Sequence, residues 1–109
     1  MAVFCDQPLM AAASAQNTAG TIDLKGEPIA ITIYVKAGAG VSAGVVSVEE
    51  ADSADYTGTW SVLATVSTTV ASAENAVRVA GPCKAIRTRI STAITGGTVS
   101  TYIVAATGE

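Results

Sequence analysis

The sequence contains no histidine, and this absence removes several classes of chemistry at once. Histidine is the most common general base in enzymes, the usual activator of catalytic serine and cysteine, and the most common transition-metal ligand. A Ser-His-Asp or Cys-His arrangement is therefore impossible. The stretches AGAG and TGG lack the Gly-Lys-Thr and the following helix of a phosphate-binding loop. We expect no catalytic residues and no cofactor.

Aromatic and charged residues are also few. The chain has one Trp, three Tyr and one Phe, and charged residues make up 14% of it, with a net charge of −3. Proteins that bind nucleic acid normally carry a strong basic excess, so we expect no nucleic-acid partner. Residues 1–74 hold eight acids and two lysines, whereas residues 75–109 hold four basic residues and one acid. This asymmetry indicates either a charge pattern across the sheets of one monomer or contacts between copies.

Two cysteines, Cys5 and Cys83, are too few for a disulfide scaffold. We expect free thiols in a protein made in a reducing cytoplasm, with a Cys5–Cys83 disulfide as the alternative. The start, MAVFCDQPLM, has no basic residue before its hydrophobic positions, and Asp6, Gln7 and Pro8 interrupt the apolar run. It therefore does not match a secretory signal. No run reaches transmembrane length without charges or turn residues, and we expect no membrane partner.

What the sequence does contain is a series of short β-strand patterns. In PIAITIYVK, residues 28–36, Ile29, Ile31, Ile33 and Val35 share one face, which is typical of a half-buried strand. Six further runs are rich in β-branched residues: TIDLK (21–25), VVSVEEA (45–51), TWSVLATVS (59–67), AVRVAG (76–81), CKAIRTRIS (83–91) and TVSTYIVAA (98–106). In TWSVLATVS we expect the residues from Trp60 to Val66 to alternate, with every second side chain on one side. About seven strands at this spacing, with no convincing helix, predict an all-β protein, a compact antiparallel β-sandwich or jelly roll over residues 21–109.

Residues 1–20 do not match a strand or a stable helix. LMAAASAQ has helical propensity, but it is short, lacks a charged face and runs into NTAG. The apolar side chains of this segment must still be buried. We expect an extended N-terminal arm that either folds back over the domain or packs on a neighbouring chain.

The stretch EEADSADYTGTW raises the possibility of a site, because it holds four carboxylates within residues 49–55. Carboxylates in one loop can bind Ca²⁺, but the spacing departs from a Ca²⁺-binding loop, and we expect no metal site. Two carboxylates can also hydrolyse a glycosidic bond, yet the chain has few aromatic residues to line a sugar cleft. The simplest interpretation is that Glu50 ends a strand and residues 51–58 form an exposed loop.

Trp60 and two arginines remain as candidates for binding. Trp60 is in register with Val62 and Val66 and is expected in the core, although together with Tyr56 it could stack on a sugar. Arg87 and Arg89 share one strand face. A phosphate or carboxylate partner, a solvated face and a subunit contact all remain open for this pair.

The pattern as a whole resembles small virion structural proteins of tailed bacteriophages. The run VVSVEEADSADYTGTWSVLATV resembles a strand, acidic turn, Trp and strand unit of such proteins. The positions that match are Val46, Val48, Glu49, Ala51, Asp52, Gly58, Trp60 and Leu63. GPCKAIRTRISTAITGGTVSTYI resembles the partner hairpin, with an Arg-x-Arg strand and a Gly-Gly turn, so that the resemblance covers about residues 28–104.

The resemblance implies a non-enzymatic virion protein of the capsid decoration, or cement, type. Such a protein would stabilise the phage head by bridging subunits of the major capsid protein, as a homo-oligomer such as a trimer, after synthesis in the host cytoplasm. The expected contacts are Val3, Phe4, Leu9 and Met10 in the arm, with Arg87 and Arg89 as second choices. Deleting residues 2–16 is expected to abolish particle binding while the domain still folds. The alternatives are a tail or head-fibre component, and a carbohydrate-binding β module that uses Tyr56 and Trp60.

Overall fold

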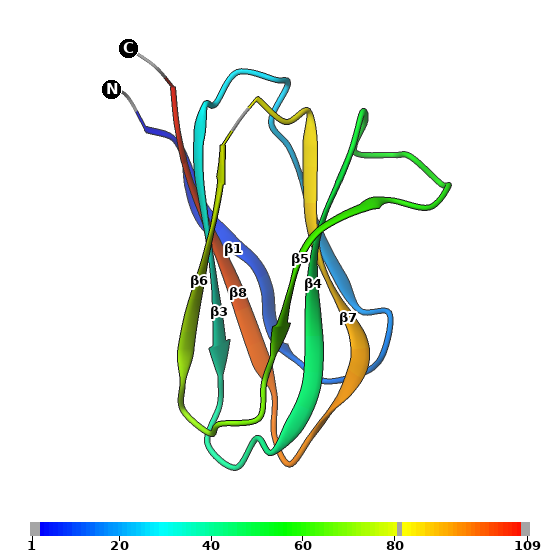
Figure 1. Ribbon diagram of the computed structural model, residues 1–109, viewed down its shortest axis with the longest axis vertical. Coiled ribbons are helices and arrows are strands. Elements are labelled where there is room, and N and C mark those ends of the chain that lie inside the picture. The colour runs from blue at the N-terminus through cyan, green and yellow to red at the C-terminus, as the bar shows by residue number, and fades with distance from the viewer. Residues whose placement is uncertain (1–2, 81, 108–109) are drawn as a thin grey trace.

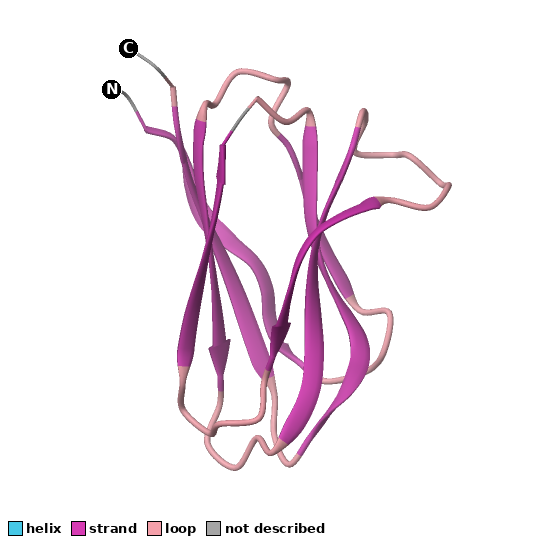
Figure 2. Ribbon diagram, viewed as in Figure 1, coloured by secondary structure: helices cyan, strands magenta, loops and turns pink. Residues whose placement is uncertain are grey.

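A computed structural model of the 109-residue chain describes residues 3–80 and 82–107. Eight strands form in this part of the chain: β1 (Val3–Ala13), β2 (Ala19–Asp23), β3 (Ala30–Ala37), β4 (Ala43–Ala51), β5 (Ser61–Ser67), β6 (Glu74–Ala80), β7 (Ala85–Thr95) and β8 (Val99–Ala106). The described residues form strands, turns and loops only, and none of them forms a helix that could cross a membrane (Figure 2).

The strands form two four-stranded antiparallel sheets packed face to face (Figure 1). Sheet 1 has the order β1-β8-β3-β6, and sheet 2 has the order β2-β7-β4-β5. Two packed antiparallel sheets of eight strands with this crossing order make a jelly roll. The prediction of an all-β sandwich or jelly roll is therefore confirmed.

The core lies between the inner faces of the central strands β3 and β8 of sheet 1 and β4 and β7 of sheet 2. Period-two alternation sends every second side chain of these strands inward. The buried apolar residues on these four strands are Ile31, Ile33, Val35, Ala37, Val46, Val48, Ala85, Ile86, Ile90, Ile94, Val99, Ile103 and Ala105. Val and Ile suit this pleated, close-packed surface because their branched side chains fill it with few rotamers.

One polar contact joins the two sheets inside the core. The hydroxyl groups of Thr88 on β7 and Thr101 on β8 share a hydrogen bond of 2.7 Å. The backbone N–H of Met10 on β1 also donates to the Thr101 hydroxyl, at 3.1 Å. The hydroxyl groups of these buried side chains therefore have hydrogen-bond partners within the core. A hydroxyl buried in an apolar environment without a partner would cost free energy.

The expectation that residues 1–20 contain no strand is wrong. Val3–Ala13 form β1, which pairs with β8 along the edge of sheet 1. Three register shifts interrupt this pairing, and Pro8 lies in the strand. Each shift adds a residue that changes the face of the following side chains, so the period-two pattern that marks a strand in sequence is lost. Residues 1–2 of the expected arm lie outside the described residues.

The expectation that Trp60, Val62, Ala64 and Val66 share one side is also wrong. Trp60 and Val66 are buried, but Val62 is exposed. The β4–β5 register skips one residue, Leu63, between the pairs Glu49↔Val62 and Val48↔Ala64. This bulge puts Val62 on the outer face of sheet 2, the opposite face from Val66.

Gly20 allows β1 and β2 to approach each other. A Cβ at this position would collide with the backbone of Leu9. Because backbone cannot move aside as a flexible side chain can, glycine is required at this crossing of the two sheets.

Candidate functional site

A cluster of charged residues occupies the outer face of sheet 2. On β7, Ile86, Thr88 and Ile90 are buried in the core, so Arg87 and Arg89 project from the opposite face. The β4–β7 register sets Glu49 directly opposite Arg87. The sequence prediction that the two arginines share one strand face is consistent with this arrangement.

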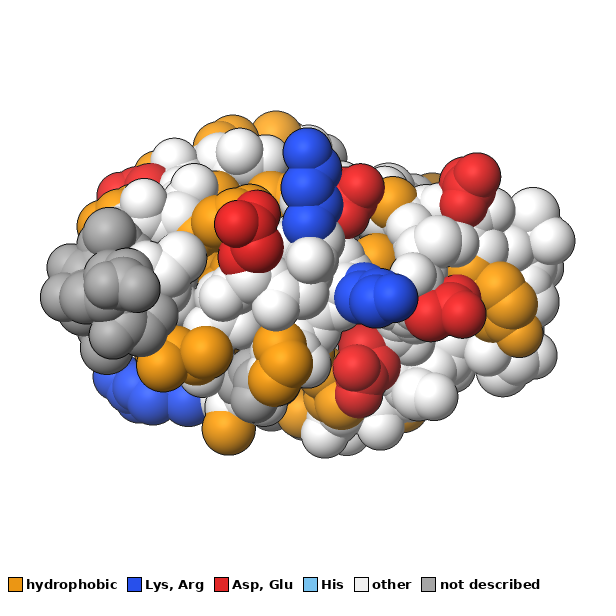
Figure 3. Space-filling model, turned by 90° about the horizontal axis from the view of Figure 1, so that it is seen from above, with side chains coloured by type: hydrophobic (Ala, Val, Ile, Leu, Met, Phe, Trp, Pro, Cys, Tyr) orange, Lys and Arg blue, Asp and Glu red, His pale blue; other side chains and the backbone are white. Residues whose placement is uncertain are grey.

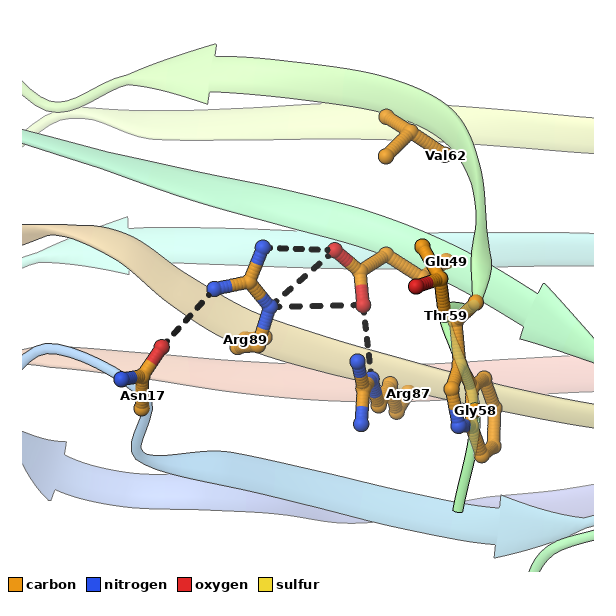
Figure 4. Close-up of a pocket in the computed structure, with 8 residues that line it drawn as sticks. Asn17, Glu49, Gly58, Thr59, Val62, Arg87 and Arg89 are labelled. Atoms are coloured by element: carbon orange, nitrogen blue, oxygen red, sulfur yellow. Dashed lines mark hydrogen bonds and ion pairs between the residues drawn. The ribbon is translucent and has the colours of Figure 1, made fainter. Parts of the chain in front are cut away.

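Glu49 binds both arginines. Its carboxylate accepts a hydrogen bond of 2.6 Å from Nε of Arg87, and Nε and Nη2 of Arg89 lie 3.2 Å and 3.1 Å from Oε2 (Figure 4). Nη1 of Arg89 also donates to the side-chain oxygen of Asn17, at 3.0 Å. Glu49 is only 1% exposed, whereas both arginines are partly exposed. A carboxylate this buried requires paired cations, and here two guanidinium groups supply them.

Trp60 forms one wall of the cluster. The guanidinium carbon of Arg87 lies 4.6 Å from the centre of the Trp60 ring, a cation–π arrangement. The indole N–H donates to the backbone carbonyl of Tyr56, at 3.0 Å, and Trp60 is 4% exposed. Tyr56 itself is exposed. Trp60 is therefore buried, as expected, but it lies beneath Arg87 on the outer face of sheet 2 and is not part of the core between the sheets.

The cluster borders a hollow of about 430 Å³. The lining residues are Asn17, Glu49, Gly58, Thr59, Trp60, Val62, Arg87 and Arg89 (Figure 4). The ionic side chains here carry one negative and two positive charges. Guanidinium groups bind carboxylates and phosphates well but do not exchange protons near neutral pH. The arrangement can therefore hold an acidic group, but it offers no nucleophile with an adjacent base.

The sequence does not distinguish Glu49 from the acidic residues beside it, because four carboxylates stand close together in the chain. In the structure Glu49 is buried on β4, Glu50 is partly buried, and Asp52 and Asp55 lie in the following loop, where the Ser53 hydroxyl donates to Asp55. No group of three or more Cys, Asp and Glu side chains gathers as a metal site anywhere in the described ranges. Only the strand register identifies the partners of Glu49.

The four expected contact residues of the N-terminal segment differ in exposure. Val3 is 67% exposed, whereas Phe4 and Leu9 are partly buried and pack against the core. Met10 is a core residue, 5% exposed. Contact of these residues with another protein stays a prediction, and Val3 is the one that presents its side chain to solvent.

Both cysteines are free thiols, as the sequence predicted. Burial raises the pKa of the Cys5 thiol. Burial also raises the pKa of Cys83, and the negative charge of Glu50 adds to the effect. A raised pKa keeps a thiol protonated and lowers its reactivity. On the outer face of sheet 1, the Tyr102 hydroxyl donates to Asp6, which raises the pKa of Tyr102.

Comparison with known proteins gives a structural match. No protein-family model matches the chain, and no curated protein matches it. Its fold is similar to a solved structure from Bacillus endospore appendages, which are described as a novel family of disulfide-linked pili. The TM-score is 0.53 at 16% sequence identity, over 94% of this chain and 87% of the appendage chain. At this identity the similarity concerns the fold. The resemblance to phage virion proteins stays a prediction.

Proposed function

We propose that this chain is a non-enzymatic structural subunit that is present in many copies in an extracellular or virion assembly. The observation that carries the proposal is that the side chains of the charged cluster are paired with one another. The carboxylate of Glu49 is paired with Arg87 and Arg89, and Arg87 in turn lies on the Trp60 ring. The charged side chains that could take part in chemistry therefore bind one another and stabilise the sheet.

The surface fits a subunit that makes contacts with neighbours. Each sheet ends in two edge strands, and the exposed large apolar side chains include Val3, Val62, Leu63 and Val70. The end of the sandwich near the chain termini presents apolar side chains interspersed with both signs of charge (Figure 3). Surfaces of this mixed kind can be shared between subunits without any reactive site.

The leading form of this proposal is decoration of a tailed-phage head, which rests on the sequence resemblance. The partner would be the major capsid protein, and the location would be the head surface. Many weak contacts per particle would then add to a stable attachment. Val3 is the contact to test first, because Met10 serves the core of the chain itself.

The second candidate is a subunit of a fibre or appendage. It is favoured by the similarity of the fold to the disulfide-linked pili of Bacillus endospores. Cys5, a free thiol on the edge strand β1, would be the group to examine for links between subunits.

Copy number and shape separate these forms. Particles and filaments from the producing cells are sedimented through a gradient, and this chain is quantified against the main structural protein of each fraction. Hundreds of copies per phage head support decoration, and filaments built of this chain support the appendage form. Absence from every particle and filament fraction would overturn the structural role.

A further inference from the structure

β6 is an edge strand of sheet 1 and is hydrogen-bonded to a neighbouring strand, β3, on one side. It pairs with β3 over seven residues, Ala30↔Ala80 to Lys36↔Glu74, with no register shift. No strand in the described part of the chain pairs with its other side. A regular strand with one row of unpaired N–H and C=O groups is a template for pairing with another chain.

The alternation of hydrogen bonds between β3 and β6 identifies which backbone groups of β6 point away from β3. Next to this pairing, the N–H of Ala37 donates to the carbonyl of Ala73, at 2.9 Å. In an antiparallel ladder such bonded pairs recur every second residue. Odd-numbered residues of β6 therefore bond to β3, and the N–H and C=O groups of Glu74, Ala76 and Arg78 point to the free edge.

The other three edges carry features that hinder pairing. β1 contains Pro8 and three register shifts, and β5 contains the bulge at Leu63. β2 is only five residues long. Prolines, bulges, short strands and charged side chains are devices by which proteins protect sheet edges. β6 has no proline and no bulge and is seven residues long, and its two charged side chains, Glu74 and Arg78, are of opposite sign.

The side chains on the free edge are complementary to a second copy of themselves. Glu74, Ala76 and Arg78 alternate along the strand, so they share the outer face of sheet 1. Glu74 and Arg78 are four residues apart, roughly 13 Å in an extended strand, too far to pair with each other. Glu74 forms an exposed ion pair of 3.4 Å with Lys36. Arg78 lies across from Thr32 and is exposed.

We propose that β6 pairs antiparallel with β6 of a second copy of this chain, about a two-fold axis at Ala76. In this register Ala76 faces Ala76 of the second copy, and Glu74 faces the second copy's Arg78 on both sides of the axis. The outward N–H and C=O groups form about six hydrogen bonds. The two sheets 1 join into one continuous sheet, and the small alanines at the axis allow close approach.

The register is specific because it is set by charge. Opposite charges directly across a strand pair stabilise it, and like charges destabilise it. A shift of two residues would break both reciprocal ion pairs. An interface of this kind is isologous, since the same residues contribute from both copies. The dimer itself is inferred from the geometry and charges of β6. Only its biological purpose rests on the proposed structural role.

The test reverses the charge at Glu74 or at Arg78. The molar mass of each variant is then measured by light scattering after gel filtration, at submillimolar protein and low salt. The wild-type chain is expected at about twice its monomer mass of 10.8 kDa. Glu74→Arg alone and Arg78→Glu alone each place like charges across the axis twice, and each variant is expected to be monomeric. An equimolar mixture of the two variants places Arg opposite Glu at both positions and is expected to recover the doubled mass.

A backbone variant tests the pairing independently. Ala76→Pro removes an N–H that points to the free edge and no bond to β3, so the fold is expected to persist while the dimer is lost. Ala76→Ser keeps the N–H and is the matched control, expected to remain dimeric. Circular dichroism verifies the β fold of each variant.

Three results would overturn the proposal: a monomeric wild-type chain, single-charge variants that stay dimeric, or a mixture that stays monomeric. None of these affects the proposed function, which depends on copy number in particles. Conversely, a dimer joined through β6 that is absent from every particle would leave this inference intact and remove the structural role.

Discussion

Nε of Arg87 donates a hydrogen bond of 2.6 Å to the carboxylate of Glu49 across the β4–β7 pair. Arg89 binds the same carboxylate from its other side. The residues are about forty positions apart in sequence, and the strand register alone brings them together. This cluster fixes the outer face of sheet 2.

Replacing Glu49 by Gln is expected to destabilise the protein. The substitution keeps the shape of the side chain but leaves Arg87 and Arg89 without a counter-charge. Breaking a fully buried ion pair costs about 3–5 kcal/mol, and the partial exposure of the arginines reduces this to roughly 2 kcal/mol. Chemical denaturation measures the change. Glu27→Gln, an exposed position, is the control and is expected within about 0.5 kcal/mol of the wild type; equal effects at both positions would contradict the role of the cluster.

The hydrogen bond between Thr88 and Thr101 predicts an asymmetric effect of valine substitutions. Thr101→Val removes the acceptor of the Met10 N–H as well as the partner of Thr88, and should cost about 1–3 kcal/mol. Thr88→Val leaves Thr101 bonded to Met10 and should cost less. In a double-mutant cycle the double variant should cost less than the sum of the two. Strict additivity would argue against the contact.

Trp60 is expected to behave as a buried residue in fluorescence. Its burial predicts weak quenching by acrylamide in the folded protein and strong quenching after denaturation. Titration with glycans should leave the emission unchanged, because Arg87 lies over the ring. A saturable shift with a glycan would instead support the carbohydrate-binding alternative. Tyr56→Ala, which removes an exposed ring, should then reduce that shift.

The raised pKa of Cys83 predicts a loss of stability at high pH. The folded state holds the thiol protonated, because burial and the charge of Glu50 disfavour the thiolate. This stability is complete below the unfolded-state pKa, near the ordinary value of 9.0, and is lost as the pH rises through the higher folded-state pKa. Denaturation midpoints between about pH 7.5 and pH 10.5, roughly one and a half units either side of that value, measure the slope, which should be smaller in Cys83→Ala. An unchanged slope would assign the effect to other groups.

Met10 and Val3 should differ sharply on truncation. Met10→Ala removes a core side chain and is expected to cost about 2–5 kcal/mol. Val3→Ala should leave stability within about 0.5 kcal/mol and, under the proposed function, weaken particle binding. Deletion of residues 2–16 removes all of β1, including Met10, and is therefore expected to destabilise the domain. A deleted chain of wild-type stability would return these residues to the role of an arm.

The regular strands were predictable because local pattern and tertiary environment agree. The alternation of Ile31, Ile33 and Val35 identifies β3 and its buried face without any structure. β1 was missed because its three register shifts and Pro8 destroy that alternation. The skipped residue Leu63 likewise put Val62 on an unexpected face. A bulge depends on the partner strand, so the sequence of one strand does not reveal it.

The sequence by itself determined the all-β class, the inward residues of the regular strands, the shared face of Arg87 and Arg89, and the lack of histidine chemistry. These properties depend on residue type and on a period of two, which are local. Only the tertiary structure decided that β1 belongs to sheet 1, that Glu49 lies between two arginines, and that β6 presents Glu74 and Arg78 on a free edge. Each of these depends on which strands pair and in what register, and register is set by contacts between residues far apart in the chain.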